Sequence, residues 1–531
     1  MLISSPAAVE TPVPQRLSLA KRLLLPSLSD LFFILIMTIS FLAGGNGWQS
    51  LLNDGDTGYH VRTGDYILAS HQVPTHDLFS FSRPGAVWYA WEWLTDVVFA
   101  VLHRWAGLKG VVLFSGIVLA VVFTLVMRDA LRRGANSLIA LALVLMAINA
   151  SYIHLLARPH IFTLLLLVVS MALIADDRRH RNARIWLLAP LTALWANLHG
   201  GFFLLFPILG LLVIGSATEG CFDRARRARR ISDAVRYTGL SLACALASLI
   251  NPYGIRLHVH IFETLNAKWL INLVNEFKSP TFHSGPDACM ILLFLAMTTV
   301  APLVQKGKIT EVLWLVFLAY CALVSVRHVE IFALVAVPIV SVEVTAWWDR
   351  WTCTRPPQSA LRILGDIAAQ MRPNFARTTL WGPAFVTAVA LGGWIQWPSD
   401  LSPSNCPVAM IHRHGEQIAA SRVFTMDQWA DYLIYHYYPR QRVFLDGRSD
   451  FYGEQMAREY LKMIEGRSRW KTVFDKYQFD LALCQADWPL ASLLRYQPDW
   501  RVVDDDGKTV LFEKAAAAGL SSLSTASQRR P

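Results

Sequence analysis

The segment best suited to chemistry follows the first long apolar run. Residues 53–66 read Asn-Asp-Gly-Asp-Thr-Gly-Tyr-His-Val-Arg-Thr-Gly-Asp-Tyr, which brings carboxylates, an imidazole and a guanidinium into one short stretch. Asp56 is our candidate general base, and Asp54 can orient it or share a divalent cation with it, since carboxylate oxygens suit Mg or Mn. If the segment is extended, Asp54 and Asp56 share one face. We therefore expect an active site here.

Composition places this segment in a membrane protein. The 531 residues are 54% hydrophobic and 17% charged, whereas soluble domains are roughly 45–50% apolar. The net charge of +10 is spread between apolar runs instead of forming one stripe, which excludes a nucleic-acid partner. No Walker motif, GxGxxG loop or internal repeat is found, so no nucleotide or dinucleotide cofactor is expected.

Apolar runs predict a polytopic helix bundle, because a helix crosses a bilayer with about 20 apolar residues. We predict about eleven spans, at residues 31–48, 108–127, 137–155, 161–175, 185–196, 202–214, 237–250, 288–304, 312–326, 331–347 and 380–394. The fifth and sixth are short and could instead form a re-entrant hairpin. Lys and Arg gather in alternate connections, which places the N-terminus inside and the C-terminus outside. The opening residues lack the pattern of a cleavable signal peptide, so none is expected.

Polar side chains gather in six turns on the predicted outer side. These turns are residues 54–62, 157–160, 197–201, 251–254, 275–278 and 327–330. Charged residues that served only to orient the protein in the membrane would lie on the inner side. We therefore predict that the six turns form one polar pocket at the outer leaflet. The alternative is that each turn is solvated and its polar residues cap helices.

These turns supply the candidate substrate-binding residues. A planar guanidinium binds the oxygens of an anion such as phosphate with two donors at once. Cations are scarce on the predicted outer side, so each one is a candidate for binding an anionic substrate. The set is Arg62, His60, Arg158, His160, His199, Glu276, Lys278, Arg327, His328 and Glu330, with Arg256 as a further cation. A lone Arg at a helix end can instead extend to lipid headgroups. The spacing of these histidines does not indicate zinc.

Two outer loops are long. The first, residues 49–107, has four tryptophans between positions 88 and 105, which predict a helix in the headgroup layer that either frames a lateral opening or only anchors the chain. The second, residues 251–285, has helical apolar spacing over 256–274. That helix could be a lid over substrate or a static interfacial helix.

Beyond residue 397 the sequence has the pattern of an α/β domain. Strands are predicted at 422–425, 442–445, 480–484, 500–503 and 509–513, and helices at 428–437, 454–464 and 490–496. Asp505-Asp506-Gly507 predicts a hairpin turn. Segment 445–453 follows a strand and could recognise an acceptor or be a salt-bridged turn. Cys406 and Cys484 could form a disulfide if they are close in space.

The predicted organisation has four parts. A cytoplasmic segment covers residues 1–28 and the membrane domain covers 29–397. The extracytoplasmic domain covers 398–514, and an Ala- and Ser-rich tail that we expect to be disordered covers 515–531.

Residues 56–67 resemble the first-loop catalytic motif of the membrane GT-C glycosyltransferases. Asp56 is followed by an aromatic residue three positions on, an Arg six on and a Tyr ten on. The predicted layout is similar too, and the nearest likeness is to bacterial polyprenyl-phosphate-sugar transferases of the protein-mannosyltransferase and lipopolysaccharide-core type. The chain departs from oligosaccharyltransferases because it lacks a WWD-like signature after the spans, which argues against asparagine-linked glycan transfer.

The resemblance implies a hexosyl or pentosyl transferase of GT-C type, multi-pass in the lipid of the bacterial plasma (inner) membrane. It would move a sugar from a polyprenyl-phosphate-linked donor to a lipid, glycan or protein acceptor at the extracytoplasmic face, with Asp56 as base. Two hypotheses from other classes stay open. One is a transporter or flippase of lipid-linked substrates, whose charges should lie near the membrane midplane. The other is a non-catalytic membrane assembly protein that displays its C-terminal domain.

Overall fold

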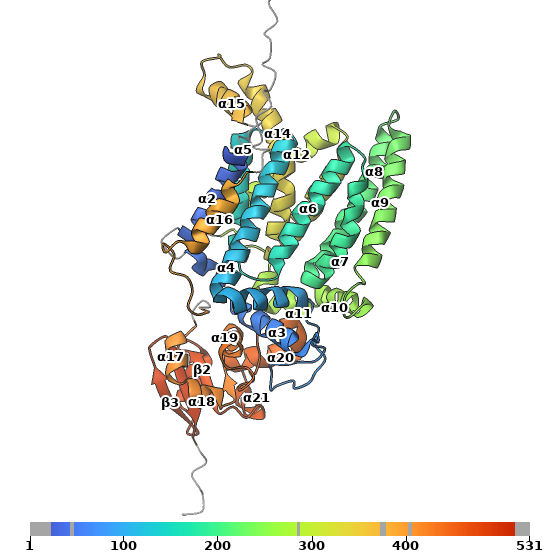
Figure 1. The fold of residues 1–531 in the computed structure, drawn as a ribbon. Coiled ribbons are helices and arrows are strands. Elements are labelled where there is room, and N and C mark those ends of the chain that lie inside the picture. The colour runs from blue at the N-terminus through green and yellow to red at the C-terminus, as the bar shows by residue number, and fades with distance from the viewer. Residues whose placement is uncertain (1–22, 43–46, 284–286, 372–378, 402–405, 516–531) are drawn as a thin grey trace, which may run out of the picture.

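The computed structural model describes residues 23–42, 47–283, 287–371, 379–401 and 406–515. Helices make up 70% of the molecule and the only named strands of this described part form one small C-terminal sheet, which confirms the mainly α expectation. The long helices stand side by side in one layer, and the sheet lies in a second layer beyond their ends (Figure 1). The predicted tail and most of the predicted N-terminal segment lie outside the described residues.

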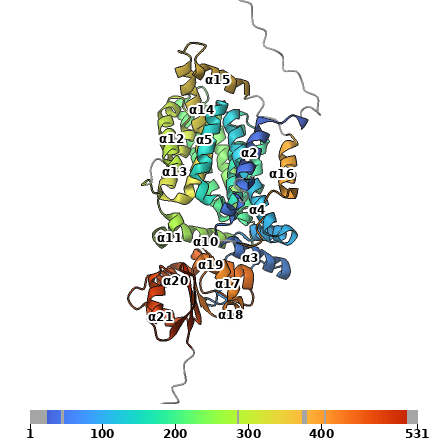
Figure 2. The same cartoon turned by 90° about the vertical axis from the view of Figure 1, so that its left-hand side faces the viewer.

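The first layer is a bundle of apolar helices. α14 has an apolar sequence on all sides and is buried along most of its length, as expected of a central helix. The bundle contains α2 (Leu28–Leu42), α4 (Trp93–Arg132), α5 (Ser137–Ala150), α6 (His160–Arg179), α7 (Leu188–Leu198), α8 (Leu205–Phe222), α9 (Arg227–Ala247), α12 (Ala288–Gln305), α13 (Ile309–Val324), α14 (Val329–Thr352) and α16 (Trp381–Leu391). α15 (Ala360–Met371) lies at the end away from the sheet (Figures 1 and 2).

Each predicted span coincides with a helix of this bundle, but the helices differ in length. Five helical segments are long and apolar enough to cross a membrane: Trp93–Arg132, His160–Arg179, Gly200–Phe222, Ala288–Gln305 and Val326–Thr352. Shorter apolar helices are Leu28–Leu42, Ser137–Ala150, Ile309–Val324 and Trp381–Leu391. The count of about eleven spans and their orientation therefore stay predictions.

Short helices and turns separate the bundle from the C-terminal domain. α4 bends at Gly107, where φ is 61°, so that its first section lies across the end of the bundle (Figure 1). The other elements here are η2 (Gly47–Leu52), α3 (Thr57–Ser70), η3 (Tyr152–His154), η5 (Gly200–Leu204), α10 (Ile255–Asn266), α11 (Lys268–Leu273), η6 (Asn275–Phe277) and η7 (Val326–His328), while η4 (Ala183–Leu187) precedes α7. The helix predicted over 256–274 is thus two helices, α10 and α11.

The C-terminal domain is built on a four-stranded sheet of order β1-β2-β4-β3. β1 (Val423–Phe424) runs parallel to β2 (Leu481–Gln485), while β4 (Thr509–Lys514) pairs antiparallel with β2 and with β3 (Trp500–Asp505). The predicted turn at Gly507, with φ 82°, joins β3 to β4. The helices are α17 (Val408–Arg413), α18 (Gly415–Ala419), α19 (Asp427–Tyr437), α20 (Ser449–Ile464), α21 (Trp470–Lys476) and α22 (Pro489–Arg495).

Two local expectations are wrong, and one condition is not met. Residues 442–445 are no strand of the sheet, because Val443 exchanges backbone hydrogen bonds with Phe79 and Phe81 of the first outer loop. Trp88, expected in a headgroup helix, is 5% exposed and packs inside the protein. The segment around Asp56 is not extended: residues 54–56 form a turn and α3 begins at Thr57. Cys406 and Cys484 are both free thiols.

Candidate active site

The acidic turn is held in place by its own backbone and by the next outer turn. The Asp56 backbone N–H donates to Asp54 Oδ1 at 2.9 Å. The Thr57 hydroxyl donates to the carbonyl of Ala157 at 3.0 Å, which places the acidic turn beside Arg158. Both carboxylates are buried, with Asp54 6% and Asp56 5% exposed, so neither is a solvated helix cap.

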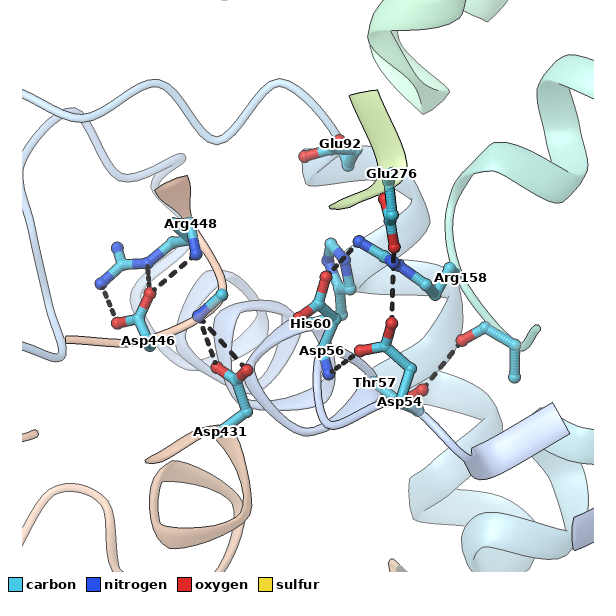
Figure 3. Close-up of polar contacts among 12 residues, drawn as sticks. Asp54, Asp56, Thr57, His60, Glu92, Arg158, Glu276, Asp431, Asp446 and Arg448 are labelled. Carbon is cyan, nitrogen blue, oxygen red and sulfur yellow. Dashed lines mark hydrogen bonds and ion pairs between the residues drawn. The ribbon is translucent and has the colours of Figure 1, made fainter. Parts of the chain in front are cut away.

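Arg158 lies at the centre of three carboxylates. Its guanidinium donates to Asp54 Oδ2 at 2.8 Å, to Glu276 Oε1 at 3.2 Å and to Asp56 Oδ2. Figure 3 shows these side chains pointing toward one another from separate segments of the chain. When all three carboxylates are ionised, one guanidinium leaves negative charge in excess. We call Asp54, Asp56, Arg158 and Glu276 the Arg158 cluster.

A second cation joins the Arg158 cluster from the loop before α14. Arg327 Nε lies 3.0 Å from Glu276 Oε2, and its guanidinium stacks over the Phe277 ring at 4.6 Å. Burial raises the pKa of Glu276, but Arg158 and Arg327 outweigh burial and hold that pKa at about 2. Four of the six predicted outer turns therefore meet here through direct contacts.

The C-terminal domain covers the other side of Asp56. α19 packs on α3, and its close approach requires Gly55 and Gly58, where a Cβ would meet the carbonyl oxygens of Gln428 and Asp431. Gly447 lies between two carboxylates: a Cβ there would collide with Asp56 Oδ1 and come within 3.0 Å of Asp431 Oδ2. Its N–H points to the Asp431 carboxylate at 3.3 Å.

Burial and neighbouring charge shift the acid strength of these carboxyls. Burial raises the pKa of Asp56 well above its ordinary value; Arg158 opposes the shift, while Asp54 adds to it. Burial also raises the pKa of Asp431, and the nearby Asp56 charge raises it further. Each of these two carboxyls therefore raises the pKa of the other. A carboxylate with a raised pKa is also the stronger base.

Some predicted site residues bind partners outside the Arg158 cluster. Arg62 donates to the Tyr435 carbonyl of α19 and pairs with Asp65 at 3.2 Å. Lys278 donates to Asn275 Oδ1 at 2.9 Å on the surface. These two cations serve local contacts in this arrangement, and the phosphate-binding role expected of them stays a prediction.

The histidines surround the cluster without touching its carboxylates. His60 Nδ1 lies 2.6 Å from Asp96 Oδ1, and His160 Nε2 lies 2.5 Å from the His154 carbonyl. His199 Nδ1 accepts from the Gly201 N–H at 3.0 Å. Among the described residues, His328 Nδ1 and Glu330 Oε2 are buried atoms without a hydrogen-bond partner.

Sequence reasoning assigned no role to two acidic residues that border the cluster. Asp431 lies on α19, which was predicted as a helix, but nothing in its local sequence indicates that it faces Asp56. Glu92 precedes α4, and its Oε1 lies 4.0 Å from His199 Nε2. Burial raises the pKa of Glu92 to about 8, and the Asp450 carboxylate adds to the shift. Its position between two tryptophans, Trp91 and Trp93, is a sequence signal that could have drawn attention to it.

Asp54 and Asp56 have the oxygen donors that Mg or Mn prefers, but three of the four carboxylate oxygens are engaged. Arg158 binds Asp54 Oδ2 and Asp56 Oδ2, and the Asp56 N–H binds Asp54 Oδ1. In this arrangement the pair does not fit a cation bound beside Arg158, because an ion would have to displace the guanidinium. A different group of possible metal ligands, Asp400 and two histidines, lies in the C-terminal domain.

Comparison with known proteins gives a match of fold only. No family model and no curated protein matches the chain. The apo oligosaccharyltransferase of Archaeoglobus fulgidus superposes with a TM-score of 0.52 at 11% identity, over 86% of this chain and 69% of that one. The oligosaccharyltransferase AglB of the same organism, in complex with an inhibitory peptide and a dolichol-phosphate, gives 0.54 at 12% identity, over 93% and 74%. The chain thus shares its fold with these archaeal oligosaccharyltransferases, and the predicted resemblance is confirmed at the level of fold.

Proposed function

We propose that the protein is a GT-C-type glycosyltransferase that moves a sugar from a polyprenyl-phosphate-linked donor to an acceptor. The observation that carries the proposal is the Arg158 cluster, in which two separate segments bring Asp54, Asp56 and Glu276 to the guanidinium of a third. The fold supports a lipid-linked donor, since one structure of that fold holds a dolichol-phosphate and an inhibitory peptide.

The proposed reaction gives Asp56, Arg327 and Arg158 separate roles. Asp56 takes the proton of the acceptor hydroxyl while the acceptor oxygen bonds to the anomeric carbon of the sugar. The bond from that carbon to the phosphate oxygen breaks, and its electron pair leaves with the polyprenyl phosphate. Arg327 suits the leaving phosphate because its side chain is 39% exposed and a guanidinium has five N–H donors. Arg158 supplies positive charge next to Asp56.

The membrane arrangement belongs to the same proposal. We propose about eleven spans within residues 29–397, a cytoplasmic N-terminus, and an extracytoplasmic domain at 398–514. The Arg158 cluster then lies at the outer face of a bacterial inner membrane. The sugar is a hexose or pentose, and the acceptor is a lipid, glycan or protein. A Mg or Mn ion at Asp54 and Asp56 stays a prediction that requires Arg158 to move.

The test uses purified full-length protein and polyprenyl-phospho-sugars labelled in the sugar. Wild type is expected to transfer or release label, and Asp56→Asn is expected to lose at least about 100-fold in rate, the lower end of what a general base contributes. Asp65→Asn is the matched control, because Asp65 is on α3, the helix that follows Asp56, but pairs with Arg62 and Arg104 outside the cluster. Equal rates for wild type and Asp56→Asn would overturn the proposal.

A further inference from the structure

We infer a transition-metal site of the zinc class, formed by Asp400, His412 and His436. Asp400 is in the linker after α16, His412 is on α17 and His436 is near the end of α19. The site lies where the chain enters its C-terminal domain. It goes beyond the proposed sugar transfer and uses none of the residues of the Arg158 cluster.

The three side chains converge on one point. His436 Nε2 lies 2.7 Å from Asp400 Oδ1, and His412 Nε2 lies 3.2 Å from Asp400 Oδ2. All three ligand atoms lie within 4.8 Å of one another. Tetrahedral zinc with bonds of about 2.0–2.2 Å separates neighbouring ligand atoms by about 3.3 Å. Small side-chain rotations therefore bring the observed atoms to the required separation.

The donor set selects the metal. Two imidazole nitrogens and one carboxylate suit Zn²⁺, Co²⁺ or Ni²⁺, whereas Mg²⁺ prefers oxygen alone. Three protein ligands leave a position for water. Tyr432 donates its hydroxyl proton to Asp400 Oδ2 at 2.6 Å, which orients the carboxylate as outer partners do in known metal sites.

Solvent reaches the site from one side. The His412 side chain is 56% exposed, and those of Asp400 and His436 are about a quarter exposed. An ion can therefore enter without unfolding the domain. Without metal, the two Nε2 atoms share the Asp400 carboxylate through hydrogen bonds; with metal, each imidazole carries its proton on Nδ1 and presents the Nε2 lone pair to the ion.

The position of the site gives the metal a structural consequence. Leu401, next to Asp400, is fully buried and packs against Gly58 of α3. Tyr435, next to His436, accepts the hydrogen bond from Arg62 of α3. A metal ion would therefore fasten the linker and α19 to the helix that begins directly after Asp56.

The experiment measures metal content, so it does not depend on sugar transfer. Full-length protein purified without a histidine tag is stripped with EDTA, loaded with ZnCl₂, desalted and analysed by mass spectrometry. Wild type is expected to retain about one Zn²⁺ per chain, and CoCl₂ is expected to give the visible absorption bands of tetrahedral Co²⁺. His412→Gln with His436→Gln is expected to bind at least about tenfold more weakly.

His414→Gln is the matched control. His414 lies two residues from His412 and binds a different carboxylate, Asp504, at 2.9 Å. It is expected to keep the zinc of wild type. If the double variant does not fold, His412→Gln alone answers the question, because this exposed side chain can be replaced without loss of packing. Wild type without retained zinc, or equal zinc in wild type and the His412 variants, would overturn the inference.

Discussion

Two buried arginines in this molecule hold carboxylates, and their surroundings differ. Arg158 touches three carboxylates, two from the turn at residues 54–56 and one from η6, and its side chain is 17% exposed. Arg448 touches only Asp446 and Asp77, and these side chains are 3%, 0% and 0% exposed. The first group has some access to solvent, since the Glu276 side chain is 35% exposed, while the second is closed.

Aromatic rings complete the enclosure of Arg448. Its guanidinium lies 4.5 Å from the centre of the Trp88 ring, 4.9 Å from Phe451 and 5.1 Å from Phe79. Tyr452 donates its hydroxyl proton to Asp446 Oδ2 at 2.8 Å. Since Asp77 and Trp88 belong to the first outer loop, this group fastens that loop to the C-terminal domain. The comparison teaches that access to solvent, and not an arginine–aspartate pair as such, distinguishes the proposed reaction site.

The largest expected effect is loss of transfer in Arg158→Gln. The rate should fall by at least about 100-fold, as when one preorganised donor is removed from an active site. Arg158→Lys should recover little, because an ammonium cannot bridge three carboxylates as a planar guanidinium does. The measurement is the transfer rate per folded molecule. Wild-type transfer rates in both variants would show that Arg158, like Arg448, supports the structure and does not take part in the reaction.

Arg448→Leu should instead reduce stability. Removing one partner of a buried ion pair costs about 3–5 kcal/mol in free energy of unfolding, because Asp446 and Asp77 remain buried and unpaired. The measurement is denaturant unfolding followed by tryptophan fluorescence. The control is Arg440→Leu, whose partner Glu416 is 85% exposed, for which no measurable change in stability is expected. If Arg448→Leu lost transfer while its stability stayed unchanged, Arg448 would have the role in the reaction that we assign to Arg158.

Arg327→Gln should have a smaller effect, on donor binding. We expect KM for the polyprenyl-phospho-sugar to rise about tenfold while kcat stays within a few-fold, because a removed ground-state contact changes KM alone. Arg256→Gln, a variant of another outer arginine, is the control. A fall in kcat without a change in KM would indicate instead that Arg327 stabilises the transition state and contributes little to donor binding.

The smallest expected effect concerns pH and Glu92. Its pKa is raised from 4.5 to about 8, so the folded protein binds this proton more tightly than the unfolded chain does. The resulting stability is full below about pH 4.5 and is lost as the pH rises to about 8. Ionised Glu92 also adds negative charge beside the donor phosphate. Between pH 7 and 9, wild type should lose transfer a few-fold more than Glu92→Gln; identical profiles would contradict this role.

Much of the helical fold was predictable because its signal is local. Long apolar runs define α4, α6 and α14, and Lys and Arg between the runs indicate orientation. The apolar residues Val443-Phe444-Leu445 misled the strand prediction, since their pattern is that of a strand while their hydrogen bonds go to the first outer loop. Sequence alone gives no information on that distant pairing.

The candidate site, like the fold, could be predicted only in part from local sequence. Asp54, Asp56, Arg158, Glu276 and Arg327 stand out in sequence, because charge in turns between apolar runs is rare. Asp431 and Gly447 face Asp56 because α19 docks on α3. More than 370 residues of chain separate them from Asp56. Docking follows from packing at Gly55 and Gly58, which no local pattern reveals.

The most direct test of the central claim is an experimental map of the protein with polyprenyl phosphate bound. The account predicts the phosphate within hydrogen-bond distance of the Arg327 or Arg158 guanidinium, on the side of the Arg158 cluster that faces away from Asp431. A phosphate bound elsewhere, for example in the surface groove lined by Arg458 and Lys462, with the Arg158 cluster unchanged, would contradict it.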